Sequence, residues 1–132
     1  MNRIFELINA QQDFAFETTL STKSHKNRIS EAQQKGFFAT LIYYWLATPQ
    51  LAERRVELRV KEGGHDIPKD VIHRRYFKGI NNLFSIYIPL CDYTMIFDNS
   101  GLEPILVYEV KKGETGVVYD KDKWTSIKEC LK

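Results

Sequence analysis

A short hinge, Gly63-Gly64-His65-Asp66-Ile67-Pro68, separates two stretches with helical periodicity and constrains the fold more than any other segment. Glycine commonly ends a helix, and proline is favoured at a helix start because its missing amide hydrogen is not needed there. The first stretch begins after Thr48-Pro49, and both stretches carry arginines: Arg54, Arg55, Arg59, Arg74 and Arg75. The sequence therefore predicts two basic helices joined by a hinge, a shape suited to closing over phosphate groups.

The first helix, expected over Pro49–Glu62, places Arg55 and Arg59 inside its apolar arc when residues advance by about 100° each. Two arginines four residues apart repel by about 0.2–0.5 kcal/mol, so both facing inward requires a shared anionic partner. Guanidinium groups match phosphate oxygens bidentately, which favours a phosphate clamp, whereas buried carboxylates would form a structural ion pair instead. The polar residues Glu53 and Glu57 are expected on the opposite face.

The second helix, expected from Pro68 to about Tyr87, has an apolar stripe formed by Ile72, Tyr76, Ile80, Leu83 and Tyr87. Arg75 flanks this stripe, whereas Arg74 points nearly opposite to it. Arg75 is therefore the better placed of the two to reach a ligand. The alternative for both arginines is a solvated helix face.

Two polar segments are candidates for ligand contact. Glu17, Thr18 and Thr19 follow the short strand predicted over Phe14–Phe16, and ligands of open α/β sheets bind at the carboxyl ends of strands. Glu17 is a candidate for binding a substrate hydroxyl or a metal-bound water, and both threonines for bonding a ligand; the alternative is a strand-ending Glu with helix caps. Asp98-Asn99-Ser100-Gly101 has the composition of a turn, with contact to a nucleotide base as the alternative.

The remaining pattern predicts an α/β fold with a mainly parallel core sheet. Phe37–Leu46 is a continuous apolar run, typical of a strand buried on both faces. Further elements are expected as helices over Arg3–Gln12, about 24–35 and Trp124–Leu131, a strand over Tyr93–Phe97, and a hairpin of Ile105–Val110 with Val117–Tyr119.

Length and composition limit the class of protein. The chain has 132 residues, 43% of them hydrophobic, which predicts one globular domain. Its net charge of +2 does not favour nucleic acid or an anionic membrane as a partner. Cys91 and Cys130 lack metal-type spacing, and no metal site is predicted. The start of the sequence lacks a secretory signal and no apolar run is long enough for a bilayer, so a soluble cytoplasmic protein is expected.

Taken together, four segments resemble the carboxyl-terminal half of the zeta-toxin-like P-loop kinases, a group often described as predicted ABC-type ATPases. The segments are Phe14–Ser21, Arg55-Val56 with Arg59-Val60, Gly63–Pro68 with Arg74-Arg75-Tyr76, and Asp98–Gly101. The similarity covers about residues 3–110 in the correct order and spacing. One such segment would be a weak match, whereas all of them in register make the resemblance specific.

The resemblance implies an ATP-dependent phosphotransferase with a P-loop kinase-like three-layer fold, a helical lid over about residues 49–80, and ATP and Mg²⁺ as cofactors. True zeta toxins phosphorylate the sugar nucleotide UDP-N-acetylglucosamine and are held inactive by an antitoxin. By resemblance, Glu17 and Thr18 lie in the sugar-substrate pocket, and we assign Thr19 and Arg55 to substrate binding as well. Arg59 with Arg74 or Arg75 would act on the transferring phosphate, and Asp98 and Asn99 would lie near the adenine.

The chain departs from the family in one respect that bears on activity. None of its seven glycines is followed by Lys-Ser or Lys-Thr, so the phosphate-binding loop is absent, together with the Asp expected as base. Phosphoryl transfer depends mainly on that loop, its Lys and the Mg²⁺ ligand. We therefore expect a single zeta-toxin-like domain over residues 1–132 without its P-loop unit, and little kinase activity from the chain alone. A complementary amino-terminal chain, an antitoxin or a second copy are the expected partners, and a non-catalytic binding module is the alternative function.

Overall fold

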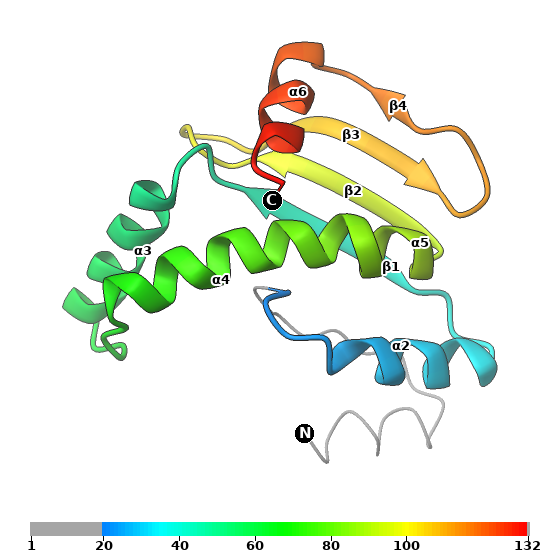
Figure 1. Ribbon diagram of the computed structural model, residues 1–132, viewed down its shortest axis with the longest axis horizontal. Coiled ribbons are helices and arrows are strands. Elements are labelled where there is room, and N and C mark those ends of the chain that lie inside the picture. Colours follow the sequence, from blue (N-terminus) through cyan, green and yellow to red (C-terminus); the bar gives the residue numbers. More distant parts are fainter. Residues whose placement is uncertain (1–19, 132) are drawn as a thin grey trace.

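The computed structural model describes residues 20–131, in which helices and strands alternate (Figure 1). In chain order the elements are α2 His25–Gln34, β1 Thr40–Trp45, α3 Pro49–Lys61, α4 Lys69–Asn82, the π-helix η1 Leu83–Tyr87, α5 Ile88–Leu90, β2 Tyr93–Asp98, β3 Ile105–Lys111, β4 Val117–Val118 and α6 Lys121–Glu129. The α/β class is therefore confirmed. The helix predicted over Arg3–Gln12 and the strand over Phe14–Phe16 lie outside the described residues.

The described sheet is mixed and has the order β1-β2-β3-β4. β1 and β2 are parallel, with Tyr43 opposite Ile96, whereas β2 pairs antiparallel with β3 and β3 antiparallel with β4. The prediction of a mainly parallel sheet is wrong for these strands. The reason is connection length, because residues 99–104 between β2 and β3 are too few for the crossover of about a dozen residues that a parallel pair needs. The predicted terminal hairpin is confirmed.

The hydrophobic core lies on one face of this sheet. Its buried members are Leu20, Trp45, Ile80, Leu83, Tyr87, Ile96, Val107 and Ile127. The stripe predicted on the second basic helix supplies Ile80, Leu83 and Tyr87, each with no exposed surface. Fully burying such a side chain contributes about 1.5–3 kcal/mol, so the stripe is what holds α4 and η1 against the sheet. In Figure 1, α4 and α6 both cross in front of the strands.

β1 corrects the expectation of a strand buried on both faces. Its burial alternates, with Leu41, Tyr43 and Trp45 turned toward the core, and Ile42 and Tyr44 exposed at 47% and 53%. An apolar run of this kind predicts a strand with both faces buried, but in this fold the core covers only one face of β1. The second face of the sheet, called the outer face below, carries Ile42, Tyr44, Met95, Phe97, Glu109 and Val117.

The hinge forms as predicted. Gly63 has a φ of 96°, a left-handed conformation that favours glycine, and it follows the last turn of α3. The amides of Gly63 and Gly64 donate to the carbonyl oxygens of Val60 and Arg59, which is the Schellman pattern of helix termination. Pro68 then stands immediately before α4. Of the helices between residues 20 and 131, none has both the length and the apolar character needed to span a bilayer.

Candidate functional site

The carboxyl ends of β1 and β2 bring two of the predicted site residues together. Arg55 on α3 donates a hydrogen bond from Nη2 to the backbone oxygen of Asn99, at 2.8 Å. When the Asn99 amide is oriented with its oxygen toward the arginine, Nη1 and Nη2 both lie 3.2 Å from that oxygen. The first helix of the predicted lid is therefore anchored at the sheet edge where parallel strands end, the edge at which α/β proteins bind ligands.

Asp98 and Ser100 build the turn that follows β2. The amide of Ser100 donates to the Asp98 carboxylate at 3.0 Å, and the Ser100 hydroxyl accepts from the amide of Ala47 at 2.9 Å. The Nζ of Lys123 lies 3.1 Å from the same carboxylate. Burial alone would raise the pKa of Asp98, but the bonds from Ser100 and the charge of Lys123 outweigh it and lower the pKa below its ordinary value. Turn chemistry, predicted for this segment, is confirmed.

The structure corrects the predicted orientation of α3. Arg55 and Arg59 are both exposed, and Leu58 beside them is 57% exposed. The face that meets the protein contains Leu51, Ala52, Glu53 and Val56, all half-buried. The expectation of inward-facing arginines is therefore wrong, because α3 meets the protein only through its first turns, and every residue from Glu57 to Lys61 is exposed.

Glu53, expected on the solvent side, instead links the two arms of the hinge. Its Oε1 lies 2.8 Å from Nε2 of His73 on α4, and its side chain is only 17% exposed. Next to this contact, the arms enclose a cleft of about 280 Å³ lined by Glu53, Val56, Glu57, Asp66, Ile67, Pro68, Lys69 and Ile72. Glu53, Glu57 and Asp66 place three carboxylates in the lining against the one ammonium group of Lys69, so the cleft does not fit a phosphate.

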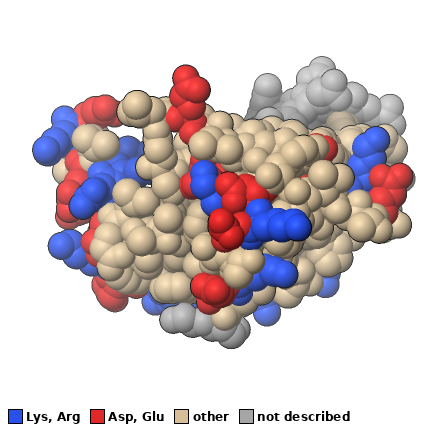
Figure 2. Space-filling view, turned by 90° about the horizontal axis from the view of Figure 1, so that it is seen from above, with Lys and Arg blue, Asp and Glu red and all other residues tan. Residues whose placement is uncertain are grey.

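The remaining lid arginines are accessible to a ligand. Arg59, Arg74 and Arg75 are all exposed, as is Arg54. Seen from above in Figure 2, basic side chains gather at the end of the molecule formed by α3 and the start of α4, with acidic side chains among them. The structure brings neither Arg74 nor Arg75 to the Arg55–Asn99 contact.

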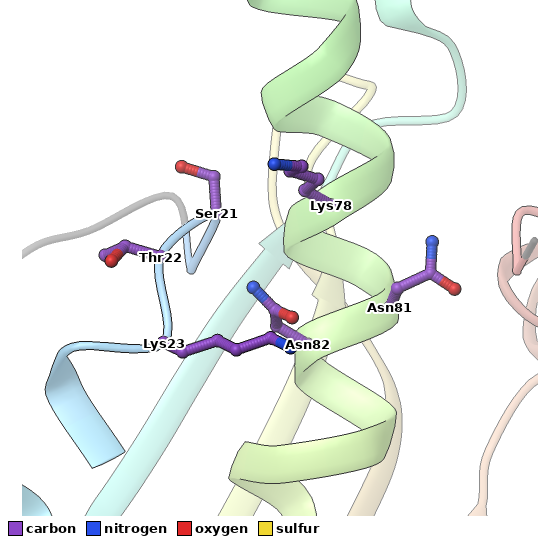
Figure 3. Close-up of a pocket in the computed structure, with 6 residues that line it drawn as sticks. All are labelled: Ser21, Thr22, Lys23, Lys78, Asn81 and Asn82. Atoms are coloured by element: carbon purple, nitrogen blue, oxygen red, sulfur yellow. The ribbon is translucent and has the colours of Figure 1, made fainter. Parts of the chain in front are cut away.

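A second site, called the lysine pocket, lies between residues 20–23 and α4 (Figure 3). It encloses about 510 Å³ and is lined by Ser21, Thr22, Lys23, Lys78, Asn81 and Asn82. No motif recognised in the sequence includes Lys23, Lys78, Asn81 or Asn82. One available signal was the pair Asn81-Asn82 inside an apolar-striped helix, since asparagine is an unfavourable residue in a helix interior.

Glu17, Thr18 and Thr19, the predicted substrate residues, lie outside the described part of the chain. They immediately precede Leu20, whose side chain is only 2% exposed and belongs to the core. The lysine pocket begins at the next residue, Ser21. The predicted substrate segment and the lysine pocket are therefore contiguous in the sequence.

The described residues do not fit a Mg²⁺–ATP site. Among residues 20–131 no group of three or more His, Cys, Asp or Glu side chains could hold a metal ion. Asp98, the acid at the strand ends, is already paired with Lys123. The glycine loop that would surround the phosphates is missing from the sequence. We therefore derive no catalytic step through ATP or Mg²⁺.

Comparison with known proteins gives one relative and no family. An uncharacterized protein of Haemophilus influenzae is 36% identical over 63 residues, which cover 48% of this chain and 45% of that protein. The chain thus matches less than half the length of this relative. No protein-family model matches the chain. No solved structure matches it either.

Proposed function

We propose that the chain provides the substrate-binding half and the arginine-bearing lid of a zeta-toxin-like phosphotransferase that acts on a sugar nucleotide. The observation that carries the proposal is the contact of Arg55 with Asn99, which attaches the basic arm to the ligand-binding edge of the sheet. The order of the segments that resemble the family supports it further. Phosphoryl transfer in this proposal requires a phosphate-binding loop from outside these 132 residues.

In this proposal the arms bind and neutralise phosphate groups. Arg59 is exposed one helical turn beyond Arg55, so the two guanidinium groups present donors on the same side of α3. Planar guanidinium groups bind phosphate oxygens in pairs of hydrogen bonds, and hydrogen bonds to charged groups are worth about 1.5–3 kcal/mol each. In this proposal the second arm closes about the Gly63-Gly64 segment, which ends α3, and brings Arg74 or Arg75 to the same phosphates.

A calorimetric titration tests this proposal. The chain should bind UDP-N-acetylglucosamine saturably, whereas Mg²⁺–ATP should give no saturable heat. Arg59→Ala should weaken sugar-nucleotide binding about tenfold, which corresponds to about 1.4 kcal/mol. Arg54→Ala is the matched control, because it lies about 140° around the same helix from Arg59 and is equally exposed. A folded chain that does not bind the sugar nucleotide would refute the proposal, and so would equal affinities of the two variants.

A non-catalytic binding module is the second candidate function, and the exposed outer face of the sheet favours it. Such a module would bind a partner chain, for example an antitoxin, through this face. The two candidates differ in one measurement: the module would form a stable complex with a protein partner whether or not a sugar nucleotide is present.

A further inference from the structure

We propose that the lysine pocket is a binding site for the phosphate group of a small ligand. The proposal does not rest on the phosphotransferase assignment, since it uses neither the lid arginines nor the strand ends. Its volume of about 510 Å³ lies in the usual range for small-molecule sites. The ammonium groups of Lys23 and Lys78 face the space between the loop and α4, whereas the hydroxyls of Ser21 and Thr22 and the amide of Asn81 point away from it (Figure 3). Ammonium groups are strong donors to phosphate oxygens, so the pocket suits a phosphate.

The two lysines enter the pocket from opposite walls. Figure 3 shows Lys78 extending from α4 toward Ser21, and Lys23 extending from the loop toward Asn82. Both side chains are exposed. Neither forms an ion pair with another of the described residues; the ion pairs found there are Lys35–Glu31, His73–Glu53 and Lys123–Asp98. An anion bound between the two ammonium groups would be attracted by both of them.

The loop that forms one wall is held rigidly by the helix that forms the other. Nδ2 of Asn82 donates to the carbonyl oxygen of Leu20 at 2.7 Å, and the Tyr87 hydroxyl donates to the carbonyl oxygen of Thr22 at 2.7 Å. Asn82 is only 8% exposed, and its bond to Leu20 uses one of its two amide hydrogens.

The π-helix η1 explains how Asn82 and Tyr87 both reach the loop. In an α-helix, residues five apart point about 140° away from each other, because each turn takes 3.6 residues. The π-helix over Leu83–Tyr87 has wider turns, with bonds from residue i to i+5, and so brings the two side chains to the same side. Single π-helical turns in longer helices occur frequently at functional sites.

Backbone strain at Leu20, where the loop begins, also indicates that the loop is held in one conformation. Leu20 has a φ of 60°, which is uncommon for a residue other than glycine and costs on the order of 1–3 kcal/mol. Its side chain is anchored in the core and its carbonyl oxygen is bonded to Asn82, so the strain is maintained by the surrounding structure. The result is a preformed loop whose residues 21–23 face α4 before any ligand arrives.

Titration of the full chain with inorganic phosphate, followed by amide chemical shifts, tests the inference. We expect saturable shifts centred on residues 21–23 and 78–82, and at least tenfold weaker binding in both Lys23→Gln and Lys78→Gln. Lys121→Gln, an exposed lysine at the start of α6, is the matched control and should bind like the wild type. The same titration is repeated with glucose 1-phosphate and with glucose, and glucose should not bind. Tighter binding of glucose 1-phosphate than of inorganic phosphate indicates that the site takes a phosphate carried on a larger ligand. Equal binding of the two indicates a site for free phosphate.

Three results would overturn the inference. They are an absence of saturable shifts at residues 21–23 and 78–82 in the folded chain, unchanged affinity in both lysine variants, and an equal loss in Lys121→Gln, which would mean that only net charge attracts the anion. Because the replaced lysines are exposed, the variants should keep the wild-type unfolding temperature, and this measurement separates loss of binding from loss of fold.

Discussion

At the scale of single residues, Gly116 shows where the fold tolerates no side chain. A Cβ at this position would lie 2.0 Å from the hydroxyl oxygen of Tyr108, and the Tyr108 ring stacks on Trp124 with centroids 3.9 Å apart. The ring cannot move away without breaking that stack, so Gly116→Ala should lower the free energy of unfolding by about 1–3 kcal/mol. Urea denaturation of the variant and the wild type measures the difference.

Gly101→Ala is the control for this substitution. A Cβ at Gly101 meets no atom within 4 Å, so this variant should change the free energy of unfolding by less than about 0.5 kcal/mol. If the two alanine variants were equally stable, the close approach of residue 116 to Tyr108 would be wrong.

Residue orientation is also where sequence reasoning had least information. A helical wheel gives the angles between Arg55, Arg59 and Leu58, but it does not say which side of the helix meets the protein. Leu58 belonged to the predicted apolar arc but is exposed, whereas the half-buried Glu53, expected on the opposite face, meets the protein. The contact with His73 fixes that choice, and it joins residues twenty positions apart, which no local pattern encodes.

At the scale of elements, the hinged pair α3 and α4 makes the next prediction. No residue of α3 is buried, so its opening should be local and require less free energy than global unfolding. The Glu53–His73 contact should therefore raise the free energy of that local opening by a measurable amount. Native-state hydrogen exchange of α3 amides in a double-mutant cycle of Glu53→Gln and His73→Gln should give a coupling energy of about 0.5–1 kcal/mol.

The same cycle with Glu57→Gln in place of Glu53→Gln is the control. Glu57 lines the same cleft but has no hydrogen bond with His73, so its coupling energy should lie within error of zero. Equal coupling in both cycles would mean that general charge, not the observed contact, holds the arms together.

Elements were predicted well where the signal is local. The Gly63-Gly64 pair predicted the end of α3, and the apolar stripe predicted the long helix that continues through η1. The antiparallel pairing of β2 with β3 was missed, although the short connection 99–104 encodes it. The lysine pocket was missed for a different reason: it depends on a π-helical turn, which brings Asn82 and Tyr87 together in a way that α-helical spacing hides.

At the scale of the whole molecule, the outer face of the sheet carries large apolar side chains that the described residues leave exposed. The rings of Tyr44 and Phe97 pack in a tilted arrangement across β1 and β2 with centroids 5.6 Å apart, and Ile42 and Val117 on the same face are 47% and 48% exposed. β1 has a hydrogen-bonded neighbour on only one side among the described strands, and its sequence from Thr40 to Leu46 contains no charged residue. Exposed apolar patches and uncharged strand edges both promote association with other chains.

We therefore predict that the isolated chain self-associates through β1 and the outer face. Tyr44→Lys should weaken association at least tenfold, because it places a charge in the middle of the apolar face and removes the ring that packs against Phe97. Leu102→Lys is the matched control, since this leucine is fully exposed in the loop after β2 and lies outside the outer face. Sedimentation equilibrium of the wild type and both variants measures the association, and circular dichroism checks that the fold is retained. A wild type that stays monomeric at the highest concentration it tolerates would show that the outer face does not mediate self-association, and an equal effect of both variants would place the interface elsewhere.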